Sequence, residues 1–361
     1  VLGGRAMEVV RDREDLTRYM REAVLASPDH PVLVDRFLQA ATEVDLDLVC
    51  DASGACIVGG VLEHVEEAGV HSGDAACVLP PHSLAPEVIE RLKDIAIALS
   101  QELKVVGLMN VQFAIQGKAI YVLEVNPRAS RTVPFIAKAT GVPLAKIAAL
   151  CMAGKTLAEL GVTKDPEIHH VAVKESVFPF ARFSNTDVIL GPEMKSTGEV
   201  MGLADRVEVA FGKSQLACGS KLPSGGVAFL SLKDDDKPAV VDLARRLQTL
   251  GFSLIATGGT VDYLAKKKIV LGRVNKVREG SPHVVDMLIR GEISLVINTT
   301  AGKQAISDSY SIRREALTRG IAHFTTVEAA RMMVGALEAQ AVGTRVYRPI
   351  QDWLQKSTVS K

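Results

Sequence analysis

The chain has 361 residues, which at about 150 residues per domain predicts two or three domains. Its 47% hydrophobic and 23% charged residues are typical of a globular protein and exclude a disordered one. The 42 basic and 42 acidic residues cancel, which argues against a nucleic acid partner for the whole chain. No apolar run reaches the roughly 18 residues that a membrane span needs, so we expect no membrane partner.

The cysteines are few, odd in number and widely spaced, and no CxxC pair is present. They are Cys50, Cys56, Cys77, Cys151 and Cys218. This pattern favours reduced thiols over a disulfide framework or a zinc site. No basic-then-apolar leader precedes them, and together these features predict a cytoplasmic protein.

The first half of the chain predicts an α+β unit with an antiparallel sheet. It opens with a glycine-rich stretch, residues 1–7, that has no strand before it, so we expect a truncated module that begins further upstream. Residues 85–102 have the periodicity of an amphipathic helix. Two β-rich runs, 108–115 and 119–125, flank the connection Gln116-Gly117-Lys118, which predicts a hairpin with a three-residue loop.

After Gly226 the pattern changes to alternating short strands and helices. We expect strands at 227–232, 252–256, 274–277 and 294–298. We expect helices at 238–250, 261–267, 284–290, 307–319 and 326–339. Such a series predicts an α/β domain with a parallel sheet covered on both faces. Two polar stretches, 161–170 and 220–226, are typical of linkers.

The predicted hairpin brings together side chains that could bind a metal. If Ile115 lies opposite Ala119, even-numbered residues of both strands share one face. That face carries Gln112, Glu124 and Asn126, whose oxygen atoms suit Mg²⁺ with nucleotide phosphates. The opposite face is then predicted to belong to the core, with Val111, Phe113, Tyr121, Leu123 and Val125.

The residues after this hairpin strengthen the interpretation. Pro127 keeps Asn126 extended, and Arg128 and Arg131 follow closely enough to neutralise phosphate charge. Glu124 alone would more often be an ordinary surface strand residue. The full pattern Glu-x-Asn-Pro-Arg-x-x-Arg favours a site.

A second candidate site lies at the strand ends of the parallel sheet, where such sheets bind ligands. Thr257-Gly-Gly-Thr260 offers hydroxyls and backbone N–H groups at a strand-to-helix turn, and Lys276, Asn298 and Thr300 add charge and donors. The hypothesis is a small phosphate-bearing ligand. The alternative is a tight turn and a helix cap without a ligand.

Two further features, a histidine pair and the tryptophan near the C-terminus, have no predicted chemistry. His169 and His170 are expected to be a solvated loop pair rather than a metal site. Trp353 is expected to be packed by a short C-terminal helix.

These motifs carry a resemblance that covers essentially the whole chain. Residues 1–7, 66–74, 107–113, 123–135 and 138–146 resemble the second ATP-grasp module of the carbamoyl-phosphate synthase large chain. The part after Gly226 resembles the same enzyme's regulatory domain, of the methylglyoxal-synthase (MGS) type. We therefore assign 1–165 to the ATP-grasp module, 166–222 to a connecting segment packed on it, 223–340 to the MGS-like domain and 341–361 to a tail.

The resemblance implies phosphorylation of carbamate by ATP, with Mg²⁺ or Mn²⁺ and with K⁺ as a further candidate cation. Gln112, Glu124 and Asn126 match metal ligands, and Arg131 matches an active-site arginine beside Glu124 and Asn126. Glu43 matches a ribose-binding acid. The other nucleotide-contacting positions are matched by Arg36, Leu38, Gly69, Val70, His71 and Ser72.

The resemblance also implies regulation by two kinds of effector. Nucleotide monophosphates would bind at Ser231, Lys237, Thr257, Thr260, Lys276, Asn298 and Thr300. Ornithine would bind at Glu66, Asp74, Glu175 and Thr325. The family usually has Tyr-Asp before this threonine, whereas this chain has His323-Phe324, so we expect weak or absent ornithine activation.

The implied partners are the rest of the large chain and a small glutaminase subunit, in pyrimidine and arginine biosynthesis. Two alternatives stay open. As an isolated piece, the chain could be an effector-binding module without catalysis. It could also come from another ATP-grasp ligase such as a carboxylase, although the domain after Gly226 argues against that.

Overall fold

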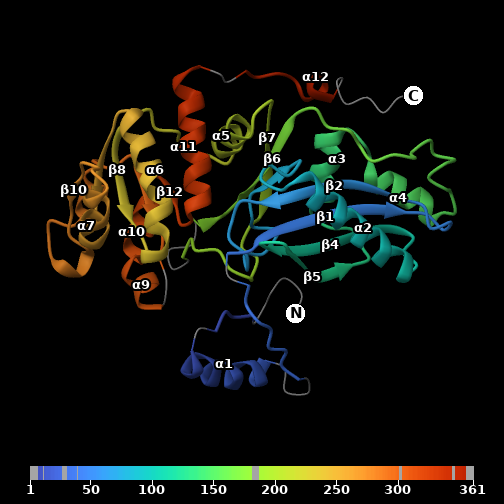
Figure 1. Cartoon of the computed structure of the whole chain (residues 1–361), viewed down its shortest axis with the longest axis horizontal. Helices are drawn as coiled ribbons and strands as arrows, with labels where there is room; N and C mark the ends of the chain where they lie inside the picture. The colour runs from blue at the N-terminus through green and yellow to red at the C-terminus, as the bar shows by residue number, and fades with distance from the viewer. Residues whose placement is uncertain are drawn as a thin grey trace.

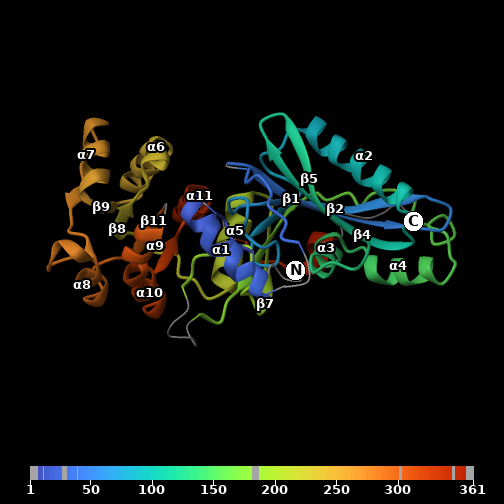
Figure 2. The same ribbon diagram turned by 90° about the horizontal axis from the view of Figure 1, so that it is seen from below.

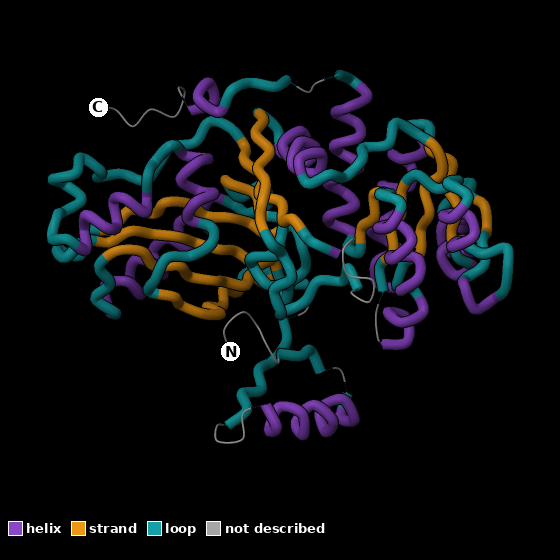
Figure 3. Tube along the Cα trace, turned by 180° about the vertical axis from the view of Figure 1, so that it is seen from behind, coloured by secondary structure: helices purple, strands orange, loops and turns teal. Residues whose placement is uncertain are grey.

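The computed structural model describes residues 7–10, 12–26, 31–38, 40–180, 187–300, 303–343 and 346–354. Two sheets lie side by side, with helices α5 (Val207–Ala217) and α11 (Val327–Ala341) between them (Figures 1 and 3). The first sheet is antiparallel and the second parallel, so the predicted α+β and α/β classes are both confirmed. Helix α1 (Arg13–Ala26) stands below both sheets in Figure 1.

The antiparallel sheet has seven strands in the order β5-β4-β1-β2-β3-β6-β7. Their bounds are β1 Thr42–Cys50, β2 Cys56–His64, β3 Cys77–Leu79, β4 Gly107–Gln116, β5 Ala119–Asn126, β6 Val171–Val177 and β7 Gly198–Ala204. Helix α2 (Pro86–Glu102) covers one face, as predicted, and α3 (Val133–Thr140) and α4 (Leu144–Met152) cover the other (Figure 2). The central strands therefore lie between two apolar layers.

The β4–β5 hairpin forms, but its register differs from the prediction. Gln116 pairs with Ala119 across a two-residue turn, so the predicted three-residue loop is wrong. A bulge between Gln112 and Phe113 then adds one residue on β5. From Gln112 onward even-numbered residues again lie opposite even-numbered residues, as predicted, although Gln112 faces Glu124 and not Val122 as the predicted register requires.

The predicted core face of this hairpin holds on β4 and, on β5, for Val125, which is half-buried against the same apolar cluster. Val111 and Phe113 are fully buried, whereas Tyr121 and Leu123 are 40% and 46% exposed. The reason is that β5 is the edge strand and that the turn and bulge shift its outer half by one residue. Tyr121 and Leu123 are therefore not core residues.

The parallel sheet has the order β10-β9-β8-β11-β12. Its strands are β8 Gly226–Ser231, β9 Phe252–Ala256, β10 Gly272–Arg273, β11 Leu295–Asn298 and β12 Ala322–Phe324. Its helices are α6 Lys237–Thr249, α7 Gly258–Lys266, α8 Val284–Ile289, α9 Lys303–Asp308 and α10 Tyr310–Thr318, together with α11. Short 3-10 turns occur at Asp234–Asp236 and Val277–Glu279.

Three expectations for this domain are corrected. The predicted strand at 274–277 is replaced by the shorter β10 and a 3-10 turn. The predicted helix at 307–319 is divided between α9 and α10 at Ser309. Strand β12 was not predicted, because its three residues include the polar His323 and are too few to show a period.

One continuous core joins the two halves of the molecule. Helix α5 packs on β6 and β7 on one side and on α11 on the other. Gly202 of β7 permits this approach, because a Cβ there would lie 2.0 Å from the carbonyl oxygen of Ala210. The resulting apolar cluster extends from Val173 in the first sheet to Leu295 in the second.

The C-terminal segment returns to the antiparallel sheet. Trp353 of α12 (Ile350–Leu354) is buried, as predicted. Its ring contacts His170, which is buried and bonded through Nε2 to the Ala139 carbonyl at 3.0 Å. The prediction of a solvated histidine pair is therefore wrong for His170. Within the described residues no single helix is long and apolar enough to span a bilayer; α3 and α4 meet that criterion only when joined across a 115° bend.

Candidate functional site

A cavity of about 680 Å³ opens on the antiparallel sheet. Strands β1, β4, β5 and β6 and the first residues of β7 line it, together with the start of α3 and the loops at 71–73, 128–132 and 194–197. Six residues predicted for the site line this cavity: His71, Ser72, Gln112, Glu124, Asn126 and Arg131. The predicted metal ligands and the predicted arginine thus lie around one space.

The hairpin supplies the oxygen atoms on one wall. Gln112 lies directly opposite Glu124, and Asn110 lies opposite Asn126. The Asn126 side-chain amide donates to Glu124 Oε1 at 2.8 Å, and Gln112 Nε2 donates to Ser72 Oγ at 3.0 Å. A carboxylate and two amide oxygens within one cavity fit a hard divalent cation that also binds phosphate.

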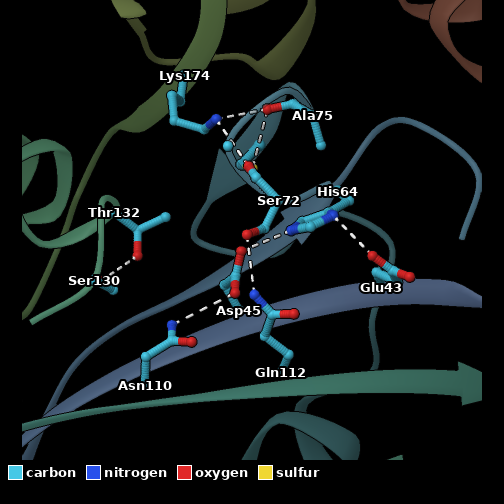
Figure 4. Close-up of polar contacts among 12 residues, drawn as sticks. Glu43, Asp45, His64, Ser72, Ala75, Asn110, Gln112, Ser130, Thr132 and Lys174 are labelled. Atoms are coloured by element: carbon cyan, nitrogen blue, oxygen red, sulfur yellow. Dashed lines mark hydrogen bonds and ion pairs between the residues drawn. The ribbon is translucent and has the colours of Figure 1, made fainter. Parts of the chain in front are cut away.

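Cationic side chains form the rim and the opposite wall. Arg128 donates to Asn126 Oδ1 at 3.1 Å, and Arg131 lines the same space. The buried Lys174 of β6 donates to the Ala75 carbonyl at 2.7 Å and to the Ser72 carbonyl at 3.3 Å (Figure 4). These groups can offset the charge of a polyphosphate.

Gly73 allows the side chains of His71, Arg131 and Met194 to lie close together at the cavity. A Cβ at Gly73 would lie 3.0 Å from Met194 Sδ, 3.1 Å from His71 Nδ1 and 3.3 Å from Arg131 Nη1. The Gly73 N–H donates to His71 Nδ1 at 2.9 Å, and burial lowers the pKa of this histidine. The imidazole is therefore oriented and neutral, and it can donate or accept a hydrogen bond.

A row of buried polar side chains lies beneath the cavity, and most of it was missed in the sequence. Asp45 and Asp47 of β1, His64 of β2 and Asn110 of β4 are all buried. His64 Nε2 lies 2.8 Å from Asp45 Oδ2, and its Nδ1 lies 3.5 Å from a Glu43 oxygen (Figure 4). The alternation Glu43-x-Asp45-x-Asp47 was the available signal, because alternate strand residues share a face.

The two aspartates of this row differ in the direction of their pKa shifts: the pKa of Asp45 is lowered and that of Asp47 is raised. Burial opposes charge on both His64 and Asp45. The neighbouring Cys77 and the hydrogen bond with Asp45 raise the pKa of His64, and the hydrogen bond with His64 lowers the pKa of Asp45. Burial raises the pKa of Asp47 to about 7, although Ser130 and Thr132 both donate to it. Asp45 and His64 therefore form a buried ion pair under the Gln112 wall.

Five of the predicted nucleotide residues form a second group outside the cavity lining, whereas His71 and Ser72 line the cavity. Glu43 Oε1 accepts the Gly69 N–H at 2.9 Å, and a Cβ at Gly69 would lie 3.0 Å from the Phe37 ring. The segment that holds Arg36 and Leu38 therefore lies next to the predicted ribose-binding acid. Val70 packs against the apolar cluster under α3 and α4. None of Arg36, Leu38, Glu43, Gly69 and Val70 lines the described cavity.

The second candidate site is assembled at three neighbouring strand ends. Asn298 pairs with Ser231, and Thr257 directly follows β9 beside them. Thr257 Oγ1 lies 3.5 Å from Ser231 Oγ, and the buried Asn298 Nδ2 has no hydrogen-bond partner among the described residues. The stretch Thr257-Gly-Gly-Thr260 was predicted to be a loop before a helix that begins at residue 261, and this prediction is wrong. Gly258, Gly259 and Thr260 form the first turn of α7, and Thr257 precedes it.

The remaining predicted effector residues differ in their placement. A Cβ at Gly259 would lie 3.4 Å from Lys237 Nζ, so this amine faces the first turn of α7. Thr260 Oγ1 accepts the Leu232 N–H at 3.2 Å, which gives this hydroxyl a structural role. Lys276 is exposed and Thr300 is half-buried after β11.

A third group of predicted residues lies between the two halves. Glu66 accepts the Ala76 N–H at 2.6 Å, and Asp74 accepts the backbone N–H groups of Lys195 and Ser196. Burial and the neighbouring Glu66 raise the pKa of Glu175 to about 8. Burial raises the pKa of Glu66 to about 7. Two acids whose ionisation is opposed in this way would accept a cationic group.

Thr325, the fourth residue predicted for this group, lies between β12 and α11 and is half-buried. The ring of His323, two residues earlier, is oriented by a backbone contact, because its Nδ1 lies 3.3 Å from the Ile321 carbonyl oxygen. Burial lowers the pKa of His323, so its ring is neutral, and Phe324 stands where the resemblance usually has an acid.

An ion pair links the parallel-sheet domain to the segment that borders the first cavity. Arg313 of α10 is buried and makes a two-pronged contact with Asp187, with Nε 2.8 Å from Oδ1. Its Nη1 also lies 3.5 Å from Asn298 Oδ1. Beyond Asp187, the Gly191 carbonyl accepts the His71 N–H at 2.8 Å. No pattern in the sequence predicts this link.

Known proteins resemble the chain over nearly its whole length. Residues 1–160 match the family described as carbamoyl-phosphate synthase L chain, ATP binding domain, and residues 239–325 match the MGS-like domain. The carbamoyl phosphate synthase large chain of Myxococcus xanthus is 69% identical over 354 residues, which are 98% of this chain and 33% of that protein. The large chain of Pseudomonas putida is 55% identical over 94% of this chain and 31% of that protein.

Solved structures are more distant. A biotin carboxylase from Campylobacter jejuni superposes with a TM-score of 0.48 and 16% identity, over 60% of this chain and 54% of that one. A likeness at this level carries no functional argument.

Proposed function

Because the chain belongs to the carbamoyl phosphate synthase large-chain family, we propose that its cavity serves the ATP-dependent phosphorylation of carbamate to carbamoyl phosphate. The chain spans about a third of the length of the curated relatives it matches. The remainder of a large chain and a glutaminase subunit are therefore part of this proposal. So are a cytoplasmic location and roles in pyrimidine and arginine biosynthesis.

The observation that carries the proposal is the convergence of Gln112, Glu124 and Asn126 with cationic side chains around one cavity. These three oxygen-bearing residues would hold Mg²⁺ or Mn²⁺. Bound there, the metal would neutralise phosphate charge and act as a Lewis acid. A role for K⁺ belongs to the same proposal, without a residue assigned to it.

The protein's own part in such a reaction is positioning and charge compensation. Gln112 is held by Ser72 and Asn126 by Arg128, so both amides have fixed orientations. Arg131 and Lys174 would face the transferred phosphoryl group and its leaving group. The neutral His71 would donate or accept a hydrogen bond without adding charge. Nothing here requires a covalent nucleophile.

Glu43 would bind the nucleotide ribose, with Gly69 and the segment around Arg36 and Leu38 beside it. The Glu43–Gly69 hydrogen bond and the proximity of Phe37 support one nucleotide-binding edge built from these residues. This edge lies outside the cavity, as expected if the phosphates extend inward from the ribose.

We further propose that the strand ends of the parallel sheet bind a nucleotide monophosphate. A phosphate site there is supported by Ser231, Thr257, Lys237 and Asn298 Nδ2, which has no hydrogen-bond partner within the part of the chain that the structure describes. The acids Glu66 and Glu175 would accept an amine such as ornithine. We propose weak or absent ornithine activation, because His323-Phe324 removes an acid from this region.

The test is to supply the chain with MgADP and carbamoyl phosphate and to assay ATP. ATP formation that is lost in Glu124→Gln, and kept in Glu102→Gln on the exposed end of α2, would support the proposal. Absence of ATP from a folded chain that still binds nucleotide monophosphates would favour the alternative, an effector-binding module without catalysis.

A further inference from the structure

Two cysteines face each other at the closed end of the β1–β2 hairpin. Cys50 is the last residue of β1 and pairs in register with Cys56, the first residue of β2. The Asp51 N–H donates to the Ala55 carbonyl at 3.0 Å, one pair further toward the tip. Hydrogen-bonded and non-hydrogen-bonded pairs alternate, so Cys50 and Cys56 occupy a non-hydrogen-bonded pair, in which opposing side chains come closest.

The sulfur atoms of the two cysteines also lie close together. Sγ of Cys56 lies 2.6 Å from Sγ of Cys50 and 3.3 Å from Ser100 Oγ of α2. Both cysteines are free thiols. Opposing residues at this kind of strand position have Cα atoms within the range that a disulfide bridges.

The two thiols are chemically unequal. Cys56 is half-buried, whereas Cys50 is buried. The hydrogen bond with Cys50 lowers the pKa of Cys56 to about 7, although burial opposes this. The same hydrogen bond, with burial, raises the pKa of Cys50. An accessible sulfur of thiolate character beside a buried thiol is the arrangement of an attacking and a resolving cysteine.

We propose that Cys50 and Cys56 are a reversible dithiol–disulfide site that reacts with low-molecular-weight disulfides. The Cys56 thiolate attacks one sulfur of the oxidant, which breaks its S–S bond and releases one thiolate. Cys50 then loses its proton and attacks the Cys56 sulfur of the mixed disulfide, releasing the second thiolate. The two cysteines are oxidised by two electrons, and the oxidant leaves as two thiols.

The site is independent of the proposed phosphoryl-transfer function. Neither cysteine lines the cavity. The hairpin end is attached elsewhere, since Asp51 Oδ2 accepts the Leu157 N–H at 2.7 Å and Asp165 Oδ1 accepts the Val58 N–H at 2.8 Å. Oxidation would therefore cross-link an end that is already held in place, without displacing Gln112 or Glu124.

The test exposes the full chain to glutathione buffers with an increasing oxidised fraction. Remaining thiols are alkylated under denaturing conditions and then counted and mapped by mass spectrometry. The proposal predicts that alkylated thiols fall from five to three, that one cross-linked peptide joins Cys50 to Cys56, and that a reductant reverses both changes. Cys218→Ser, at a half-buried cysteine elsewhere, should still lose two thiols.

Single substitutions separate the two roles. Cys50→Ser should trap Cys56 as its glutathione mixed disulfide, whereas Cys56→Ser should leave Cys50 fully alkylatable. Cys50→Ala serves the same purpose if serine at this buried position impairs folding, which circular dichroism would detect. Five alkylatable thiols in the wild-type chain at every buffer composition, or an intramolecular cross-link that persists in either variant, would overturn the proposal.

Discussion

The two sheets of this chain present functional side chains in different ways. In the antiparallel sheet, the cavity is lined by the faces of β1, β4, β5 and β6. In the parallel sheet, the candidate residues Ser231, Thr257 and Asn298 lie at strand ends. A face site depends on register, because a slip of one residue turns each side chain to the other face. An end site depends only on where the strands stop.

The β4–β5 hairpin shows how sensitive a face site is. Its turn begins one residue away from the prediction, and without the bulge Glu124 would lie opposite Val111 rather than Gln112. The bulge is therefore what places Glu124 and Asn126 on the cavity side.

The largest effect that we predict concerns the contact between the two regions. Arg313→Met leaves Asp187 without its buried partner and should lower the free energy of unfolding by about 3 kcal/mol. Urea unfolding measures this. Arg290→Met is the matched control, because Arg290 pairs with Glu292 at the surface and its loss should leave the free energy of unfolding nearly unchanged. Equal losses in both variants would show that the Arg313 contact does not connect the regions.

The next effect concerns the acids between the regions. The pKa of Glu175 is raised to about 8, so the folded chain holds this proton more tightly than the unfolded chain does. The contribution of Glu175 to the free energy of unfolding is fully present below the ordinary pKa of a glutamate and is lost as the pH rises toward 8. Glu175→Gln should remove about 3 kcal/mol of the loss in unfolding free energy between pH 5 and pH 8.

Urea unfolding at the two pH values measures this change. Glu87→Gln, on the exposed first turn of α2, should keep the wild-type pH dependence. An unchanged pH dependence in Glu175→Gln would mean that this glutamate ionises without opposition.

The smallest effect separates the two kinds of site. Thr257→Val keeps the side-chain shape and removes one hydroxyl at the strand ends, so nucleotide monophosphate affinity should fall about tenfold. MgADP affinity should not change. Isothermal titration calorimetry measures both, with Thr249→Val at the exposed end of α6 as the control. A parallel loss of MgADP affinity would contradict separate sites.

Local sequence patterns predicted the elements that have long, regular periods. The helix at 85–102 and the strands around Gly117 were found because their apolar spacing is clear. The bulge was not, because it arises from pairing between strands rather than from the residues of either one. Strand β12 was too short to show a period.

The candidate site was predicted in part for the same reason. Gln112, Glu124 and Asn126 stand on one hairpin, so the alternation of side chains between the two faces of its strands is enough to predict that they lie together. Lys174 approaches from β6, which pairs with β3 and is distant in sequence from the hairpin. The raised pKa of Asp47 depends on burial beneath Ser130 and Thr132, which only the packed sheet provides.

The central claim is that the β4–β5 face binds a metal–nucleotide complex. Its most direct test is calorimetric titration of ADP into the wild-type chain, Glu124→Gln and the control Glu102→Gln, each with Mg²⁺ and with a chelator. The account predicts metal-dependent binding that Glu124→Gln weakens about 100-fold, equivalent to about 2.7 kcal/mol, and that Glu102→Gln leaves unchanged. Equal affinity in Glu124→Gln and the wild-type chain, or binding that is indifferent to the chelator, would contradict it.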